Sequence, residues 1–157
     1  MLAYKPVKDL SLILSLIWQN KPLVTAICGL IVAQVLKFVF YYIKTRQVNF
    51  RHLVSASGMP SSHTAMVAGL ATAVGLHIGW NTPSFAIAFI FACIVMYDAA
   101  GVRRAAGRQA RVLNQILDDI FHRGKFRGER LTELLGHTPL EVFAGAILGI
   151  FVAFMMY

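Results

Sequence analysis

The chain has 157 residues, which is room for a single domain. Hydrophobic residues make up 57% of it and charged residues only 14%, and its mean hydropathy is +0.63. This composition leaves too few polar groups to cover a water-soluble globule, and it does not fit a disordered, collagenous or coiled-coil protein. We therefore predict an all-α polytopic membrane protein in which residues 1–157 form one membrane domain.

The charged residues are strongly basic overall. Lysine and arginine number 15 against 7 aspartates and glutamates, giving a net charge of +8. In a membrane protein this excess indicates cytoplasmic loops and anionic lipid headgroups before it indicates nucleic acid. Few aromatic residues interleave with the arginines, so we expect no nucleic-acid partner. Cys28 and Cys93 lie in apolar runs and are interpreted as packing residues.

Hydrophobic segments divide the chain into one short run and four spans. Residues 1–21 form an interfacial segment whose apolar run, Leu10–Trp18, is too short to cross a hydrocarbon core of about 30 Å and is predicted to be interfacial or re-entrant. Each of the four longer stretches opens at or near a proline, a residue that suits the first helical turn. They are Pro22–Ile43, Pro60–Gly79, Pro83–Ala100 and Thr138–Tyr157. Small residues such as Ala65, Gly69, Gly145 and Gly149 recur at intervals of four and predict close helix packing.

Four crossings place segments 44–59 and 101–137 on the same side of the membrane. Eleven of the fifteen cations belong to these segments: Lys44, Arg46, Arg51, Arg103, Arg104, Arg108, Arg111, Arg123, Lys125, Arg127 and Arg130. The positive-inside rule makes this side cytoplasmic. We expect an integral protein of a bacterial plasma membrane, with 101–137 as a basic cytoplasmic loop inserted before the last helix.

The sequence Pro60-Ser61-Ser62-His63 lies where a loop becomes the second span. A helix N-terminus presents unpaired N–H groups and a positive dipole, so Ser61, Ser62 and the neighbouring amides would form an anion site with an imidazole at its edge. The alternative is that a serine caps the helix and His63 merely lies at the interface.

A second histidine motif, His137-Thr138-Pro139-Leu140-Glu141, opens the last span. His137 and Glu141 are four residues apart on one helical face, so the carboxylate would hold one ring N–H and make the other nitrogen more basic. Thr138 and Glu141 also fit a capping box, which would explain the glutamate without any chemistry. The capping box does not explain His137.

Several further charges fall near the same predicted membrane face. Lys37 lies inside the first span, where a cation is by default a functional candidate facing the bundle interior, although snorkelling to the interface is an alternative. Arg103 and Arg104 follow the third span, and Asp98 would orient one guanidinium. Together with Lys37 and Lys44, the arginines would surround a phosphate.

These motifs resemble the type 2 phosphatidic acid phosphatase superfamily, which includes vanadium-dependent haloperoxidases, and most closely its divergent short membrane branch. The superfamily signatures are Lys-x6-Arg-Pro, Pro-Ser-Gly-His and Ser-Arg-x5-His-x3-Asp. The resemblance covers roughly residues 33 to 150. Ser62 replaces the glycine of the second signature and Glu141 the final aspartate, and Leu131 stands at the arginine position of the third. Arg103 or Arg104 would replace that arginine if 105–135 is an insertion, and Lys37 ranks above Lys44 for the first signature.

The resemblance implies a metal-independent phosphatase without cofactors. His137 would attack phosphorus and form a phosphohistidine, Glu141 would orient it, and His63 would donate a proton to the leaving group and then activate water. Lys37, Lys44, Ser61, Ser62, Arg103 and Arg104 would bind the phosphoryl oxygens. A lipid phosphate or polyprenyl diphosphate is the implied substrate class.

Two other functions remain open from the sequence. A lipid-phosphate binding or translocating protein would keep the anion cluster without hydrolysis. The pattern Asp98-x-x-Gly101-x-x-Arg104 is also faintly similar to the metal-dependent CDP-alcohol phosphotransferases, but Asp98 lacks the neighbouring carboxylates which that chemistry needs. Four spans are fewer than the six typical of membrane phosphatases, and a homodimer would supply the missing contacts.

Overall fold

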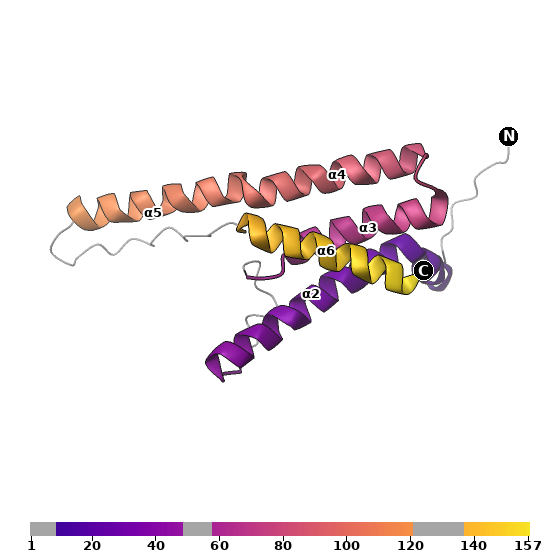
Figure 1. The fold of residues 1–157 in the computed structure, drawn as a ribbon, viewed down its shortest axis with the longest axis horizontal. Helices are drawn as coiled ribbons and strands as arrows, with labels where there is room; N and C mark the ends of the chain where they lie inside the picture. Colours follow the sequence, from indigo (N-terminus) through magenta and orange to yellow (C-terminus); the bar gives the residue numbers. More distant parts are fainter. Residues whose placement is uncertain (1–8, 49–57, 121–136) are drawn as a thin grey trace.

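The computed structural model describes residues 9–48, 58–120 and 137–157, and every element in these ranges is an α-helix (Figure 1). Within 102–120 it describes the side chains of 105–117 only. The helices are α1 (Leu10–Gln19), α2 (Lys21–Thr45), α3 (Ser62–Ile78), α4 (Pro83–Ala100), α5 (Val102–Ile120) and α6 (Pro139–Met156). The predicted all-α membrane fold is confirmed.

Three helical stretches are long and apolar enough to cross a membrane. They are Lys21–Thr45, Pro83–Leu117 and Pro139–Met156, and they correspond to three of the four predicted spans. The fourth forms α3, whose 17 residues lie at the lower end of the length that spans a bilayer. α3 is also the helix with the most buried residues, because the other helices surround it.

Polar caps followed by prolines set where the spanning helices begin. The Asn20 side chain accepts a hydrogen bond from the amide of Leu23 at the start of α2, and Thr82 and Thr138 cap α4 and α6 in the same way. Proline follows each cap within two residues, where its missing N–H costs no helical hydrogen bond. These local signals explain why the predicted spans agree closely with the observed helices.

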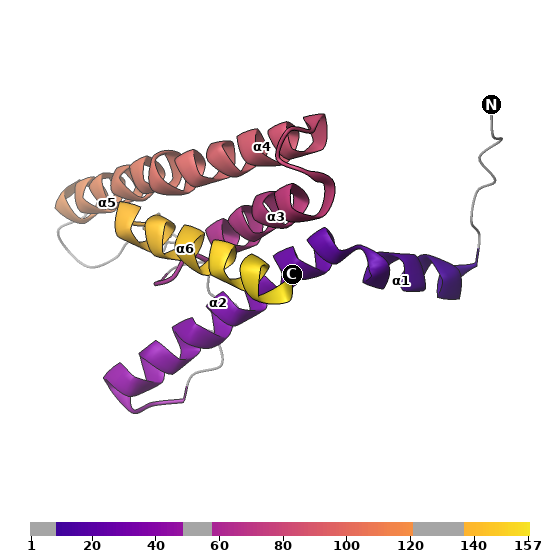
Figure 2. The same cartoon turned by 45° about the vertical axis from the view of Figure 1, so that its right-hand side comes forward.

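α3 forms the centre of the bundle and packs against α2, α4 and α6 (Figures 1 and 2). Glycines let the backbones approach: a Cβ atom at Gly149 would collide with the carbonyl oxygen of Ala65, and one at Gly145 with that of Ser61. On the other side, a Cβ at Gly29 of α2 would lie 3.0 Å from the Ala65 oxygen. The predicted packing role of the small residues is thus confirmed along α3.

The two ends of the bundle gather different parts of the chain. At one end the start of α2 meets the ends of α3 and α6: the rings of His77 and Tyr157 lie 5.8 Å apart, and the Lys21 ammonium lies 5.7 Å from the Tyr157 ring. At the other end α3 and α6 begin together, since the Ser61 amide donates a 3.0 Å hydrogen bond to the Glu141 carbonyl. His77 therefore lies at the end opposite to both histidine motifs.

Two helices lie outside this core. α1 contacts α2 and has no buried residue, which fits an interfacial segment as well as a re-entrant one. α5 continues nearly in line with α4 beyond Gly101 (Figure 1). The segment 101–137 was expected to be a loop, and that expectation is wrong for its first half. Apolar residues at helical spacing among the arginines make an amphipathic helix there.

Candidate functional site

Lys37 of α2 points into the bundle and meets the start of α3. Its side chain is only 5% exposed, and its Nζ atom donates a 3.1 Å hydrogen bond to the Oγ atom of Ser62, which is 1% exposed. Gly58, in the left-handed region at φ +103°, lies beside the Lys37 stem: a Cβ there would be 4.0 Å from Cδ. The snorkelling alternative for Lys37 is therefore wrong, because the ammonium group is held inside the protein.

Ser61 and Ser62 have different tasks at the start of α3. Ser61 is the N-cap: its Oγ accepts hydrogen bonds from the Thr64 amide at 3.4 Å and the Thr64 hydroxyl at 3.0 Å. Ser62 is the first helical residue and pairs with Lys37. The capping alternative thus holds for Ser61, whereas Ser62 carries the contact that brings a cation to the positive end of the α3 dipole.

His137 and Glu141 form the pair that their spacing predicts. The Nδ1 atom of His137 lies 2.9 Å from Oε2 of Glu141, with the histidine 4% and the glutamate 22% exposed. The same Oε2 accepts the Thr138 amide at 3.1 Å, and the Glu141 amide donates to the Thr138 hydroxyl at 3.3 Å, which completes the capping box. Glu141 therefore caps α6 and orients His137 at once. A hydrogen bond through Nδ1 directs Nε2 away from the carboxylate.

The serine and histidine motifs are joined into one cluster. The hydrogen bond from the Ser61 amide to the Glu141 carbonyl fixes the first turn of α3 against the first turn of α6. The missing side chain of Gly145, one turn beyond Glu141, permits this approach, because a Cβ there would meet the Ser61 carbonyl oxygen. The hydrogen bond from Lys37 to Ser62 adds α2 to the same cluster. Residues from α2, α3 and α6 thus share one buried region.

His63 belongs to the same first turn of α3. It directly follows Ser62, and it is half-buried where Ser61, Ser62 and Thr64 around it are buried. An imidazole that is partly exposed beside buried cationic and hydroxyl groups can exchange protons with water or a ligand while remaining in a fixed place. This is the position expected for a proton donor at the edge of an anion site.

The remaining predicted phosphate ligands are placed less centrally. Lys44 lies in the last turn of α2, two turns beyond Lys37, and is exposed. Asp98 is half-buried near the end of α4. Arg103 and Arg104 begin α5, and their side chains lie outside the described residues. In both views the junction of α4 and α5 lies next to the start of α6 (Figures 1 and 2), and α4 contacts α6. Arg51, a lesser candidate, lies outside the described ranges.

One further polar side chain lies on α2 within the membrane span. Gln34 is one turn before Lys37 on the same helix, and its Oε1 atom is buried with no hydrogen-bond partner among the described residues. It is not among the candidate site residues predicted from the sequence. A polar residue inside an apolar span is the signal that would have made it a site candidate by itself.

The donor set of this cluster suits an anion. It offers the Lys37 ammonium, the Ser62 hydroxyl and the amides of two helix N-termini, all groups that donate hydrogen bonds or carry positive charge. Across the described residues, no three histidine, cysteine, aspartate or glutamate side chains are grouped so that they could hold a metal ion. A phosphoryl group fits these donors by both charge and hydrogen bonding.

Comparison with known sequences agrees with this reading of the motifs. The sequence profile of the divergent PAP2 family matches residues 18–152, which include every candidate site residue from Lys37 to Glu141. The chain belongs to the divergent PAP2 family. It is also 40% identical over 149 residues to the uncharacterized membrane protein YuiD of Bacillus subtilis (strain 168), across 87% of this chain and 94% of YuiD. No solved structure matches it. The PAP2-related resemblance predicted from the motifs is confirmed, and the protein is an integral membrane protein.

Proposed function

We propose that this divergent PAP2 protein hydrolyses a lipid phosphate or polyprenyl diphosphate through a phosphohistidine, without a metal ion. The observation that carries the proposal is the buried Lys37–Ser62 hydrogen bond beside the His137–Glu141 pair. A lysine is costly within a membrane span, and here it is placed at a helix N-terminus next to a carboxylate-oriented imidazole. If Lys37 served only the fold, it would not need the oriented imidazole of His137 nearby.

In the first step the phosphoryl oxygens bind to Lys37, Ser62 and the amides that begin α3. Nε2 of His137 attacks phosphorus and a nitrogen–phosphorus bond forms. The bond from phosphorus to the leaving oxygen breaks, which is an ester bond in a lipid phosphate and an anhydride bond in a polyprenyl diphosphate. His63 gives a proton to the departing oxygen. Glu141 stabilises the charge that develops on the His137 ring, because its carboxylate is already 2.9 Å from Nδ1.

In the second step water replaces the leaving group. His63, now neutral, takes a proton from that water while the water oxygen attacks phosphorus. The nitrogen–phosphorus bond breaks, His137 regains its free nitrogen, and inorganic phosphate leaves. Lys37 would lie where negative charge is greatest, and Arg103 and Arg104 are proposed to assist it through bidentate contacts.

The test is phosphate release by the purified protein from phosphatidate and polyprenyl diphosphates in lipid nanodiscs. We expect turnover that persists in EDTA and is blocked by vanadate, which mimics pentacoordinate phosphorus. Acid quenching should trap a phosphohistidine in the unaltered protein and none in His137→Ala. Activity that disappears in EDTA and returns with Mg²⁺ would contradict the mechanism. Tight binding of lipid phosphates without release would favour the non-catalytic binding protein.

The proposed site faces the cytoplasm and therefore acts on phosphates of the inner leaflet. The support is the charge asymmetry: the end of the bundle where α3 and α6 begin carries the basic segments 44–59 and 101–137. Single cysteines at Gln115 of α5 and at Asn81, in the turn after α3, test this in a chain lacking Cys28 and Cys93. In intact cells an impermeant thiol reagent should modify position 81 and spare position 115. The reverse pattern would place the site outside.

A further inference from the structure

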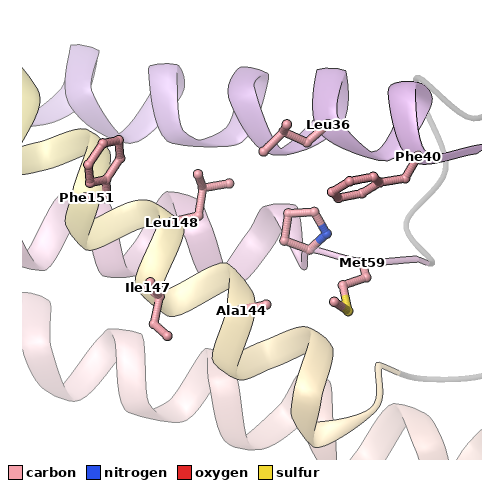
Figure 3. Close-up of a pocket in the computed structure, with 8 residues that line it drawn as sticks. Leu36, Phe40, Met59, Ala144, Ile147, Leu148 and Phe151 are labelled. Carbon is pink, nitrogen blue, oxygen red and sulfur yellow. The ribbon is translucent and has the colours of Figure 1, made fainter. Parts of the chain in front are cut away.

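An apolar pocket lies beside the proposed phosphate site, between α2 and α6. Its volume is about 320 Å³, and its described lining consists of hydrophobic side chains and a proline (Figure 3). Leu36 and Phe40 contribute from α2, Pro60 from the segment before α3, and Ala144 and Phe151 from α6. Because the lining offers water no polar partners, the pocket favours an apolar occupant over ordered solvent.

The pocket begins where the phosphate site ends. Leu36 and Phe40 flank Lys37 on α2, and Pro60 directly precedes the cap residue Ser61. On α6 the lining starts at Ala144, one turn beyond Glu141. From there to Phe151 is seven residues, or about 10 Å along the helix. Each of the three chain segments that build the phosphate site thus continues directly into the pocket.

We propose that this pocket binds the phosphate-proximal part of the substrate's hydrocarbon chain, so that one chain of the lipid lies between α2 and α6 while its phosphate meets Lys37 and Ser62. This inference rests on the proposed phosphate site. Both helices are long and apolar enough to span the membrane, and the lining residues Ile147 and Phe151 are largely exposed on the outer surface of the bundle. A chain can therefore enter the pocket from the surrounding lipid without passing through water.

This arrangement separates recognition of the chain from chemistry at the phosphate. The lining residues do not touch the reacting atoms, so chain binding would act on substrate affinity and leave the chemical step unchanged. Because the chain passes from lipid to a pocket that is equally apolar, the gain comes from packing against the lining residues and not from leaving water. The first several methylene or isoprenyl carbons should therefore dominate discrimination between long-chain and short-chain phosphates, and carbons beyond Phe151 should add little.

Replacing Ala144 with a larger residue would fill the pocket with a side chain of the protein itself. Ala144 has the smallest side chain of the lining, and Figure 3 shows it among the larger side chains of α2 and α6. Ala144→Phe should raise KM for a long-chain lipid phosphate by about tenfold, because the ring occupies the space of the chain and removes on the order of ten of its packing contacts. Its kcat, and its kcat/KM for a water-soluble short-chain phosphate, should stay within about twofold of the unaltered protein.

Ala86→Phe is the matched control. Ala86 is exposed on α4, away from the pocket, so the same substitution there should change neither substrate. Ala144→Leu is a smaller change and should raise KM by an intermediate factor. It tests the same proposal if the phenylalanine variant does not fold. Equal KM values for Ala144→Phe and Ala86→Phe in folded proteins would overturn the proposal.

Photo-crosslinking tests the pocket without relying on turnover. Phosphatidate and a polyprenyl phosphate, each with a diazirine near the phosphate end of its chain, should label α2 and α6 residues of the pocket, and Ala144→Phe should reduce the labelling. The more strongly labelling probe would identify the substrate class. Labelling of α4 instead of α2 and α6 would overturn the proposal. So would the absence of labelling, as expected if a second copy of the chain covers the pocket. Pocket labelling without phosphate release would support it while overturning the proposed hydrolysis.

Discussion

The two ends of the central bundle use similar residues in different ways. α3 carries a histidine near each end: His63 lies beside the buried Ser62–Lys37 hydrogen bond, whereas His77 stacks edge-on against the exposed ring of Tyr157. Each end also has a lysine of α2. Lys37 is buried against α3, and Lys21 is exposed over the Tyr157 ring.

The difference lies in burial and hydrogen bonding, not in residue type. A polar group removed from solvent loses its hydration and must be compensated by partners in fixed geometry. At the Lys37 end these partners are the Ser62 hydroxyl for the lysine and the Glu141 carboxylate for His137. The Lys21 end has the aromatic and cationic groups that commonly anchor helices at a membrane surface. The comparison therefore supports placing the proposed chemistry at the Lys37 end and membrane anchoring at the Lys21 end.

The largest expected effect comes from replacing a histidine of each end, His137 and His77, with alanine. His137→Ala should reduce kcat by about 10³-fold or more because it removes the nucleophile. His77→Ala should leave kcat within about twofold, since its ring contacts Tyr157 at the opposite end. Phosphate release measures both, and thermal midpoints in detergent verify folding. Equal losses in the two variants would erase the functional distinction between the ends.

The two lysines sharpen the comparison by separating function from stability. Lys37→Met should lower kcat/KM by about 10²-fold through loss of a phosphate ligand, while the thermal midpoint should not fall, since an apolar side chain replaces a buried charge. Lys21→Met should change neither quantity appreciably. A midpoint that falls in step with activity would show that Lys37 serves the fold rather than the phosphate.

Glycine contacts test how firmly the site end depends on helix packing. Gly149→Ala should destabilise the protein by about 1–3 kcal/mol, because its Cβ meets backbone atoms of Ala65 and Gly69 that cannot move aside. Gly75→Ala at the other end should cost less, since its Cβ meets the half-exposed Trp80 side chain, which can rotate. Chemical denaturation in mixed micelles compares the two. A larger loss for Gly75→Ala would contradict this ranking.

The smallest effect concerns α1, which leads into the Lys21 end. Hydrogen bonds from the Ser11 side chain and amide hold the pKa of Asp9 below its usual value of 3.8. The carboxylate therefore stabilises α1 above that value, and the contribution is lost as the pH falls through the lowered pKa. Hydrogen exchange of α1 amides, corrected for intrinsic rates, should accelerate below about pH 4. Asp9→Asn should cap α1 without this pH dependence, and an unchanged dependence would exclude Asp9 as its source.

Much of the architecture was predictable because its signals are local. Apolar runs of spanning length, polar caps and prolines fixed where α2, α4 and α6 begin, and the number of crossings placed His63 and His137 at one end of the bundle. The His137–Glu141 pair follows from helical spacing alone, since residues four apart share a face. The Thr138 capping box follows from the same local rule.

The sequence by itself thus determined the fold class, the two histidine motifs and their common end, because each depends on neighbours within one or two turns. The structure also showed that the expected loop begins as α5. Only the tertiary structure decided that Lys37 rather than Lys44 joins Ser62, and that an apolar pocket adjoins the proposed phosphate site. These two features depend on how α2, α3 and α6 are rotated and spaced, and close contacts between glycines and distant backbone segments set that spacing.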